Sequence, residues 1–222
     1  MSDSSSLSAN AGASTLTQSR RLILTSLFTA LTVIGAHLRV PLPLVPLSLQ
    51  TFFVLLSGSI LGPIYGAASQ LLYLSLGLAG LPVFTKGGGP AYVLQPTFGY
   101  LLGFPLASLV AGALIHRRPT QAPARSALGF SKLLLYNFIA TIAIFVPGVL
   151  YLWWNTNHLI GTDLPFSRAV WVGAIIFLPA DLLKIFAASY LYLKLQPRLS
   201  RMQSVSADTP SSATKEASPA SM

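Results

Sequence analysis

The sequence predicts an all-α polytopic membrane protein with six transmembrane helices. Of its 222 residues, 53% are hydrophobic and only 9% are charged, whereas about a quarter of the residues in an average soluble domain are charged. Residues 40–85, 87–116 and 133–162 contain no aspartate, glutamate, lysine or arginine. Each stretch is longer than the roughly 20 residues that cross a bilayer as a helix. The stretches are continuously apolar, which does not fit the alternating pattern of a transmembrane β-barrel.

The composition narrows the classes of protein to which the chain can belong. It contains no cysteine, which excludes structural disulfides, thiolate catalysis and thiolate metal sites. The net charge of +9 comes from basic residues that flank apolar runs, which indicates membrane orientation rather than nucleic-acid binding. No HExxH motif is present, and the only glutamate, Glu216, lies near the C-terminus. We therefore expect a protein that is not an enzyme and that holds no metal ion or cofactor.

Five hydrophobic helices are expected before residue 160, and prolines and glycines separate them. Three prolines between positions 41 and 46 force an extended connection after the first helix. Gly62-Pro63 predicts a tight turn between the second and third helices, and loops containing glycine or basic residues separate the later ones. The expected helices are 22–38, 47–61, 64–81, 97–115 and 133–154.

The last apolar region, 169–195, contains the sixth helix. Proline is favoured in the first turn of a helix, as at Pro179, and the helix dipole would stabilise the carboxylate of Asp181 there. We therefore predict that this helix begins near Pro179 and that 169–178 is a separate segment dipping in from the outside. The alternative is one long kinked helix over the whole region.

The two ends of the chain differ in composition from the apolar core. Residues 1–19 are rich in serine, alanine and threonine, and residues 202–222 are rich in serine, alanine and proline. Neither end can bury much apolar surface. We expect disordered tails at 1–19 and 198–222 around a six-helix transmembrane domain, 20–197.

The lysines and arginines divide unevenly between the two sides that six helices would define. Cations concentrate on the cytoplasmic side of a membrane protein, so both termini are expected in the cytoplasm and the protein in the cell membrane. Lys184 lies within a helix, and the other side has Arg39, Lys86 and Arg168. The side with the termini has Arg20, Arg21, Arg117, Arg118, Arg125, Lys132, Lys194, Arg198, Arg201 and Lys215.

Two charged residues fall inside the last apolar region. Asp181 and Lys184 are three residues apart and therefore share one helix face. Charges inside a membrane are costly and usually mark a ligand or ion path, so we favour a binding function over an ion pair that only orients helices. Lysine can bind a carboxylate and aspartate can accept from N–H donors, which suits an amphoteric or anionic polar solute.

Further polar residues fall at the same outer level as Asp181 and together predict a ring of donors and acceptors around one pocket. Each of them alone also fits an interface anchor or a bond between helices. Lys86 precedes three glycines, which permit close approach of the backbone to a ligand, although a plain flexible loop explains this run equally well. Its order does not match a nucleotide-binding P-loop. The ring comprises Gln50, Thr51, Tyr92, Gln95, Thr97 and Tyr100.

Two small residues, Ser26 and Ala30, lie one turn apart on the first helix. Small residues at this spacing let another helix approach closely. The approaching helix belongs either to a partner subunit or to the bundle itself.

Several motifs in order connect the chain to a known family. They are the run VPLPLVPLSLQTFF at 40–53, LPVF at 81–84, the glycines at 87–89, PTFGYLLGF at 96–104 and LPADLLK at 178–184. With these motifs the chain resembles BioY, the biotin-binding S component of energy-coupling factor (ECF) vitamin transporters, over about residues 20–197.

The resemblance implies an S-component-like bundle with a pocket near the outer surface. It also implies that the loop after the third expected helix, 64–81, covers this pocket. It implies that Asp181 and Lys184 bind biotin, and our hypothesis gives the ureido N–H groups to Asp181 and the carboxylate to Lys184, with Lys86 able to assist. It also implies that Ser26 and Ala30 face a transmembrane coupling subunit, which works with ATPase subunits.

The expected function is biotin uptake, with biotin, an ECF module and the lipid bilayer as partners and no nucleic acid. The alternative is an ion-coupled secondary transporter of a small carboxylated solute, with Asp181 as its proton site. A more distant alternative is an intramembrane enzyme.

Overall fold

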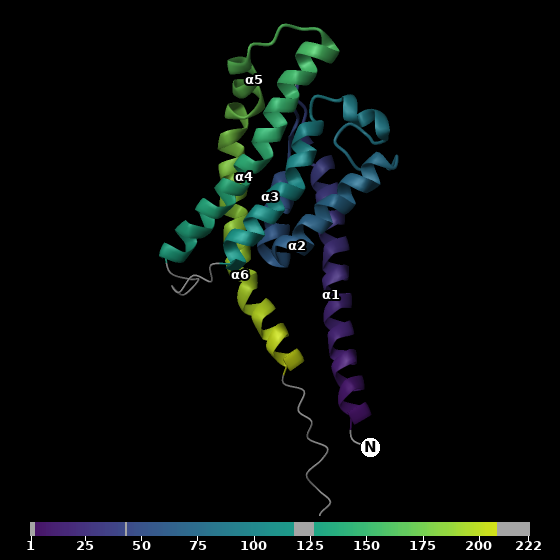
Figure 1. Cartoon of the computed structure of the whole chain (residues 1–222). Coiled ribbons are helices and arrows are strands. Elements are labelled where there is room, and N and C mark those ends of the chain that lie inside the picture. The colour runs from purple at the N-terminus through teal and green to yellow at the C-terminus, as the bar shows by residue number, and fades with distance from the viewer. Residues whose placement is uncertain (1–2, 43, 118–126, 208–222) are drawn as a thin grey trace, which may run out of the picture.

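The chain folds into a bundle of helices with one short hairpin (Figure 1). The computed structural model describes residues 3–42, 44–117 and 127–207. Within these ranges, five helices are long and apolar enough to cross a membrane. This confirms the prediction of an all-α polytopic membrane protein. The five candidate spans are 18–37, 50–78, 98–116, 129–160 and 166–197.

The first helix, α1 (Asp3–His37), is followed by a two-stranded hairpin. Strand β1 (Arg39–Val40) pairs antiparallel with β2 (Leu47–Ser48), with Arg39 opposite Ser48. The proline-rich sequence between the strands explains why the chain is extended here, because proline cannot continue a helix. The second helix therefore begins at Gln50 and not at residue 47 as expected.

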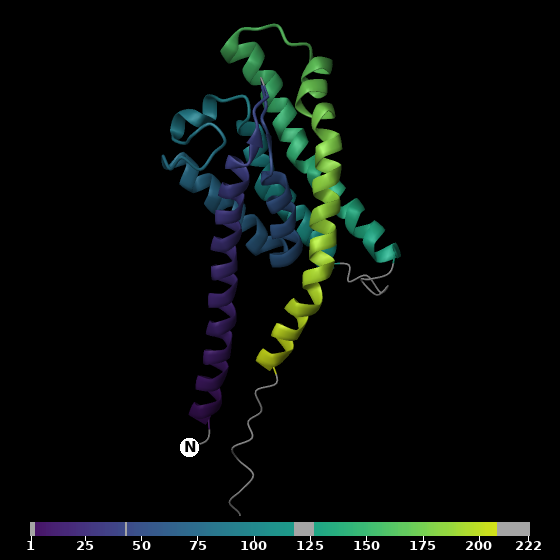
Figure 2. The same cartoon turned by 180° about the vertical axis from the view of Figure 1, so that it is seen from behind.

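Helix α2 (Gln50–Leu78) is broken in its middle, where Gly62 has φ 81° and Pro63 follows. Only glycine adopts this backbone readily, so the predicted turn is confirmed. The two arms of α2 diverge as a V (Figures 1 and 2). They touch near the break, since a Cβ atom on Gly66 would lie 2.8 Å from the Cα atom of Gly58. The two helices expected at 47–61 and 64–81 thus form one element and count as one of the five candidate spans.

The middle of the chain forms the centre of the bundle. A loop with the short 3₁₀ helix η1 (Pro90–Leu94) leads from α2 into α3 (Phe98–Arg117). Helix α4 (Ala127–Asn155) begins earlier than expected and continues as a π-helical turn, η2 (Thr156–Ile160). Helix α3 packs between α2 and α4.

The last apolar region divides as the sequence predicts. Helix α5 (Phe166–Gly173) and the single turn η3 (Ile175–Phe177) precede α6 (Leu178–Ala207). Ala174, between α5 and η3, has φ −133° and ψ −56°, which interrupts the helical path. Asp181 therefore lies in the first turn of α6, where the dipole favours a carboxylate. The alternative of one long kinked helix also describes this region, because 166–197 counts as one candidate span that is interrupted at Ala174.

Two helices extend into the segments that are expected to be tails. Helix α1 already begins at Asp3, and α6 continues to Ala207, beyond the expected boundary at residue 197. Residues 3–19 contain no proline, and extending an existing helix avoids the cost of nucleation. The part of the expected C-terminal tail at 208–222 lies outside the described residues, as do Arg118 and Arg125.

Polar residues inside the bundle join the helices. Asn137 of α4 donates its Nδ2–H to Ser189 Oγ of α6 at 2.9 Å, and its Oδ1 accepts from Ser59 of α2 at 3.4 Å. All three side chains are fully buried. Burial of amides and hydroxyls is costly without such partners, so these bonds specify how the helices pack.

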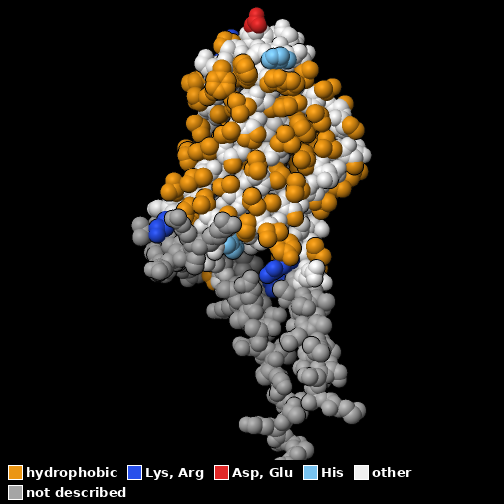
Figure 3. Space-filling model, viewed as in Figure 1, with side chains coloured by type: hydrophobic (Ala, Val, Ile, Leu, Met, Phe, Trp, Pro, Cys, Tyr) orange, Lys and Arg blue, Asp and Glu red, His pale blue; other side chains and the backbone are white. Residues whose placement is uncertain are grey.

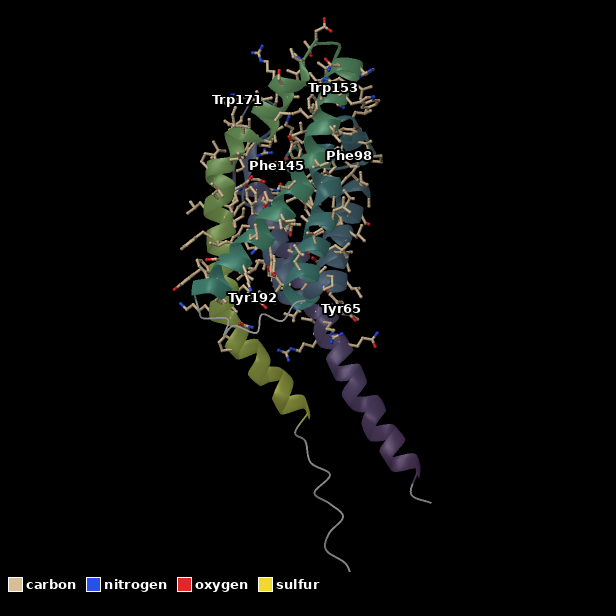
Figure 4. All side chains as sticks on the ribbon, turned by 60° about the vertical axis from the view of Figure 1, so that its left-hand side comes forward. Tyr65, Phe98, Phe145, Trp153, Trp171 and Tyr192 are labelled. Carbon is tan, nitrogen blue, oxygen red and sulfur yellow. The ribbon has the colours of Figure 1, made fainter. Side chains whose placement is uncertain are left out.

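The surface fits a bilayer. Hydrophobic side chains cover the side of the bundle, and the blue basic residues in the lower part of the view lie toward the end where α1 begins and α6 ends (Figures 1 and 3). Tyr65 and Tyr192 lie near the end of the bundle where α1 begins and α6 ends, whereas Trp153 and Trp171 lie toward the opposite end (Figure 4). Aromatic residues at two levels are typical of the two membrane–water interfaces.

Candidate substrate-binding cavity

A cavity opens between the hairpin, the start of α2, the loop after α2, and helices α3, α4 and α6. The empty space between the lining residues measures about 580 Å³, a figure that includes open solvent. Its apolar wall includes Val45, Leu101, Phe104, Ile144, Phe145 and Phe177. Its polar groups are Ser48, Gln50, Thr51, Thr85, Tyr92, Thr97, Tyr100, Thr141, Asp181 and Lys184.

The two charges of the cavity come from the first turns of α6. Lys184 Nζ lies 2.8 Å from Asp181 Oδ1, and the two residues are 9% and 4% exposed. Because α6 begins at Leu178, Asp181 and Lys184 lie near its N-terminal end. Their spacing of three residues places both side chains on the same helix face, which lines the cavity. The cavity thus offers one acceptor anion and one donor cation, which pair with each other in the structure.

Gln50, in the first turn of α2, is held by hydrogen bonds at both ends of its amide. Ser48 Oγ donates to Gln50 Oε1 at 2.9 Å, and Gln50 Nε2 donates to the hydroxyl of Tyr73 at 2.7 Å. The Tyr73 hydroxyl in turn donates to the carbonyl oxygen of Val83 at 3.1 Å. Tyr73 does not line the cavity, whereas Ser48 and Gln50 do.

The hydroxyls of the cavity are partly committed to the protein itself. Tyr92 Oη lies 3.0 Å from Thr85 Oγ1 and 3.4 Å from Thr97 Oγ1, so this group links the two ends of the loop after α2. Tyr100 donates its hydroxyl to the carbonyl oxygen of Gly173 at 2.7 Å. Tyr100 therefore presents its ring to the cavity and uses its hydroxyl to hold the end of α5.

The loop after α2 is attached to the helices beneath it. Phe84 is buried against α2 at a position that only glycine allows, because a Cβ atom on Gly77 would lie 2.0 Å from the Phe84 ring. Gly89 N–H donates to the carbonyl oxygen of Gly77 at 2.7 Å, and Asn155 Nδ2 of α4 donates to that of Leu94 at 2.8 Å. The loop is a packed wall of the cavity.

Of the site residues predicted from the sequence, the structure brings seven to the cavity and leaves two outside its lining. Lys86 is exposed and Gln95 is half-buried, and neither lines the space. Sequence reasoning missed Ser48, Thr85 and Thr141. Neighbouring side chains on an extended segment point in opposite directions. A solvent-facing Lys86 therefore implies that Thr85 points inward, and this is the one signal that could have identified Thr85.

Other expectations concern residues away from the cavity. Ser26 and Ala30 are both exposed on α1 and do not line the cavity. Among the residues that the structure describes, no three histidines, cysteines, aspartates or glutamates gather as metal ligands.

A family model and two relatives from the same family match most of this chain. A protein-family model described as the BioY family matches residues 7–201. A relative in Lysinibacillus sphaericus, named probable biotin transporter BioY, is 42% identical over 174 residues, which cover 78% of this chain and 85% of the relative. The biotin transporter BioY of Thermotoga maritima is 36% identical over 178 residues, 80% of this chain and 96% of the relative.

A solved structure is also similar. It is described as the crystal structure at 2.1 Å of the S-component for biotin from an ECF-type ABC transporter. Its TM-score with this chain is 0.71 at 25% sequence identity, and the match covers 82% of this chain and 93% of that one.

Proposed function

Because the chain belongs to the BioY family, we propose that it is a biotin-binding S component, the membrane subunit that captures biotin for uptake by an ECF transporter. Its relatives are named biotin transporters, and the similar solved structure is described as an S-component for biotin. The match spans nearly the full length of that structure and of the Thermotoga relative, so the resemblance concerns whole proteins.

The observation that carries the proposal is the buried pair Asp181–Lys184 in an otherwise mostly apolar cavity. Biotin has an apolar bicycle and chain, a ureido group with two N–H donors and a carbonyl, and a terminal carboxylate. In the proposed complex Asp181 accepts from the ureido group and Lys184 binds the carboxylate, each with a charge-assisted hydrogen bond. Gln50, Thr51, Tyr92 and Tyr100 complete the wall.

Two predicted site residues, Lys86 and Gln95, do not contact biotin in this proposal. Lys86 is exposed and does not line the cavity, so Lys184 is the cation that we assign to the ligand carboxylate. Gln95 lies at the end of η1, where its N–H donates to the carbonyl oxygen of Tyr92. We assign Gln95 to the support of this wall and not to direct contact with biotin.

In the proposed topology the chain crosses the membrane six times, with both arms of α2 counted as crossings. The V shape of α2 supports this, because the chain reverses direction at Gly62. Helix α1 then begins and α6 ends on the same side, and the excess of lysine and arginine supports a cytoplasmic location for that side. The cavity opens toward the outer side.

The proposed partners are those of an S component. The sequence contains no nucleotide-binding motif, so ATPase subunits would supply the energy and a transmembrane coupling subunit would transmit it. The exposed small residues Ser26 and Ala30 on α1 suit close contact with such a subunit.

Titration of the purified full chain with biotin in detergent, without any ion gradient, tests the proposal. An S component should bind about one biotin per chain tightly, and a variant carrying both Asp181→Ala and Lys184→Ala should not. Weak binding that strengthens only in vesicles with a proton or sodium gradient would instead support an ion-coupled carrier.

A further inference from the structure

Tyr73 has a role in the cavity although it does not line it. We propose that Tyr73 is a positioning residue that fixes the orientation of the Gln50 side-chain amide. This inference deepens the proposed biotin-binding function and rests on it. Its basis is the buried chain of hydrogen bonds that runs from Ser48 through Gln50 and Tyr73 to the backbone of the loop after α2.

The directions of these hydrogen bonds follow from the chemistry of the groups. The carbonyl oxygen of Val83 can only accept, so the Tyr73 hydroxyl must donate its single hydrogen there. The hydroxyl can then only accept from Gln50, which requires the NH₂ group of the amide to face it. Gln50 Oε1 must therefore face Ser48, which lines the cavity with it.

The surroundings of Tyr73 hold this arrangement in place. Tyr73 is fully buried, and Gln50 is 3% exposed, so water does not compete for their hydrogen bonds. The Tyr73 ring packs edge-on against Phe84, with the centroids 5.3 Å apart, and lies 6.4 Å from the ring of Phe104. The hydroxyl is thus presented to Gln50 by a ring that cannot move freely in a close-packed interior.

The consequence is a cavity wall with defined polarity at Gln50. An oxygen with a free lone pair on the Ser48 side can accept an N–H group of a ligand, whereas a flipped amide would present a donor. Without the Tyr73 hydroxyl, both orientations become available to Gln50. Ligand binding would then have to select one of them, which lowers the apparent affinity.

A double-mutant cycle tests this role in the full chain. Tyr73→Phe removes one oxygen and keeps the packed ring, and we expect it to weaken biotin binding roughly 3- to 10-fold, the range of one neutral hydrogen bond. In a Gln50→Ala background the same substitution should have no effect on the dissociation constant, because no amide remains to be oriented. A role in packing or in holding Val83 would persist in that background.

The outcomes separate this inference from the proposed function. Equal losses in both backgrounds, or no loss in the wild-type background, overturn the role of Tyr73 alone. Failure of the wild-type chain to bind biotin overturns the proposed function and this inference with it. Should Tyr73→Phe not fold, Gln50→Glu carries the test, because it puts an acceptor oxygen in place of the NH₂ group that faces the Tyr73 hydroxyl. A loss of affinity at least as large as that of Gln50→Ala supports the proposed orientation, and a smaller loss overturns it.

Discussion

At the scale of single residues, the close contact between Asp181 and Lys184 bears on the stability of the two buried charges and on the proposed choice of ligand. A lone charge in an apolar cavity carries a large desolvation cost, and the 2.8 Å contact between the opposite charges offsets much of that cost. An incoming ligand with its own anion and its own N–H donors can replace each half of this contact. In the proposed complex, the pair therefore favours ligands that satisfy both residues together.

The first prediction concerns Lys184. Loss of one partner from a desolvated charge interaction costs about 2–5 kcal/mol, so Lys184→Ala should weaken biotin binding by roughly 30- to several-thousand-fold. Neutral biotin amides, which lack the carboxylate, should lose less affinity. Lys194→Ala, on an exposed part of the same helix, is the matched control and should bind as the wild type does. Equal losses for biotin and its amide in calorimetry would show that Lys184 does not hold the carboxylate.

Which cavity residues the sequence reveals depends on how visible their chemistry is. Asp181 and Lys184 are charges in an apolar run, and Gln50 opens a helix, so the pattern alone identifies them. Thr141 escapes because its hydroxyl bonds to the carbonyl oxygen of Asn137 within α4, which any apolar helix tolerates. Lys86 is exposed and does not line the cavity, and the sequence of a loop does not reveal which way a charged side chain points.

At the scale of elements, local backbone chemistry set most boundaries. Pro179 predicted where α6 begins, and Gly62-Pro63 predicted the break in α2. The hairpin was not predicted, since two-residue strands have no periodicity to detect. The attachment of the loop after α2 was equally hidden, because the contact of Phe84 with Gly77 joins residues on different elements.

The second prediction tests this attachment. In Gly77→Ala the new methyl group would overlap the Phe84 ring, and overpacking of this kind costs about 1–3 kcal/mol. The loop that contributes Thr85 and Tyr92 to the cavity should loosen, so biotin should dissociate about tenfold faster, the factor given by 1.4 kcal/mol. Stopped-flow dissociation measures the rate, and hydrogen exchange of residues 82–96 measures the loosening.

The matched control for this variant is Leu72→Ala, an exposed position on the same helix. It should leave both the dissociation rate and the exchange of the loop unchanged. If Gly77→Ala behaves like the control, the packing of Phe84 does not hold the cavity wall. The wild-type loop should already be protected from exchange without biotin, because its anchors to α2 and α4 do not involve the ligand.

At the scale of the whole molecule, the third prediction concerns topology. The sequence contains no cysteine, so single cysteines report their side of the membrane without background. A cysteine in place of Asp163, between η2 and α5, should react with a membrane-impermeant maleimide in intact cells. A cysteine in place of Lys132, near the start of α4, should react only after the membrane is permeabilised. Both positions are exposed, so the reverse pattern would invert the proposed orientation.

The last prediction separates biotin binding from energy coupling, which we propose to occur on different surfaces. The cavity draws on the hairpin, α2, α3, α4, α6 and the loop after α2, whereas Ser26 and Ala30 lie exposed on α1 and line none of it. Tryptophan at both positions would keep a partner helix at a distance, because close approach requires small side chains. The double variant should retain its biotin affinity in detergent and lose ATP-dependent biotin uptake in cells that contain the coupling module.

The control for the double variant carries tryptophan at Leu102 and Leu106, two exposed positions with the same spacing on α3. It should bind and take up biotin at wild-type levels, since bulky apolar residues facing lipid disturb neither surface. Uptake at the wild-type rate by the α1 variant would remove this face from the interface. Loss of both binding and uptake would mean that the α1 face supports the bundle itself. Binding and uptake measured on the same variants therefore decide whether α1 is the surface that contacts the coupling subunit, which would transmit the energy of ATP hydrolysis from the ATPase subunits.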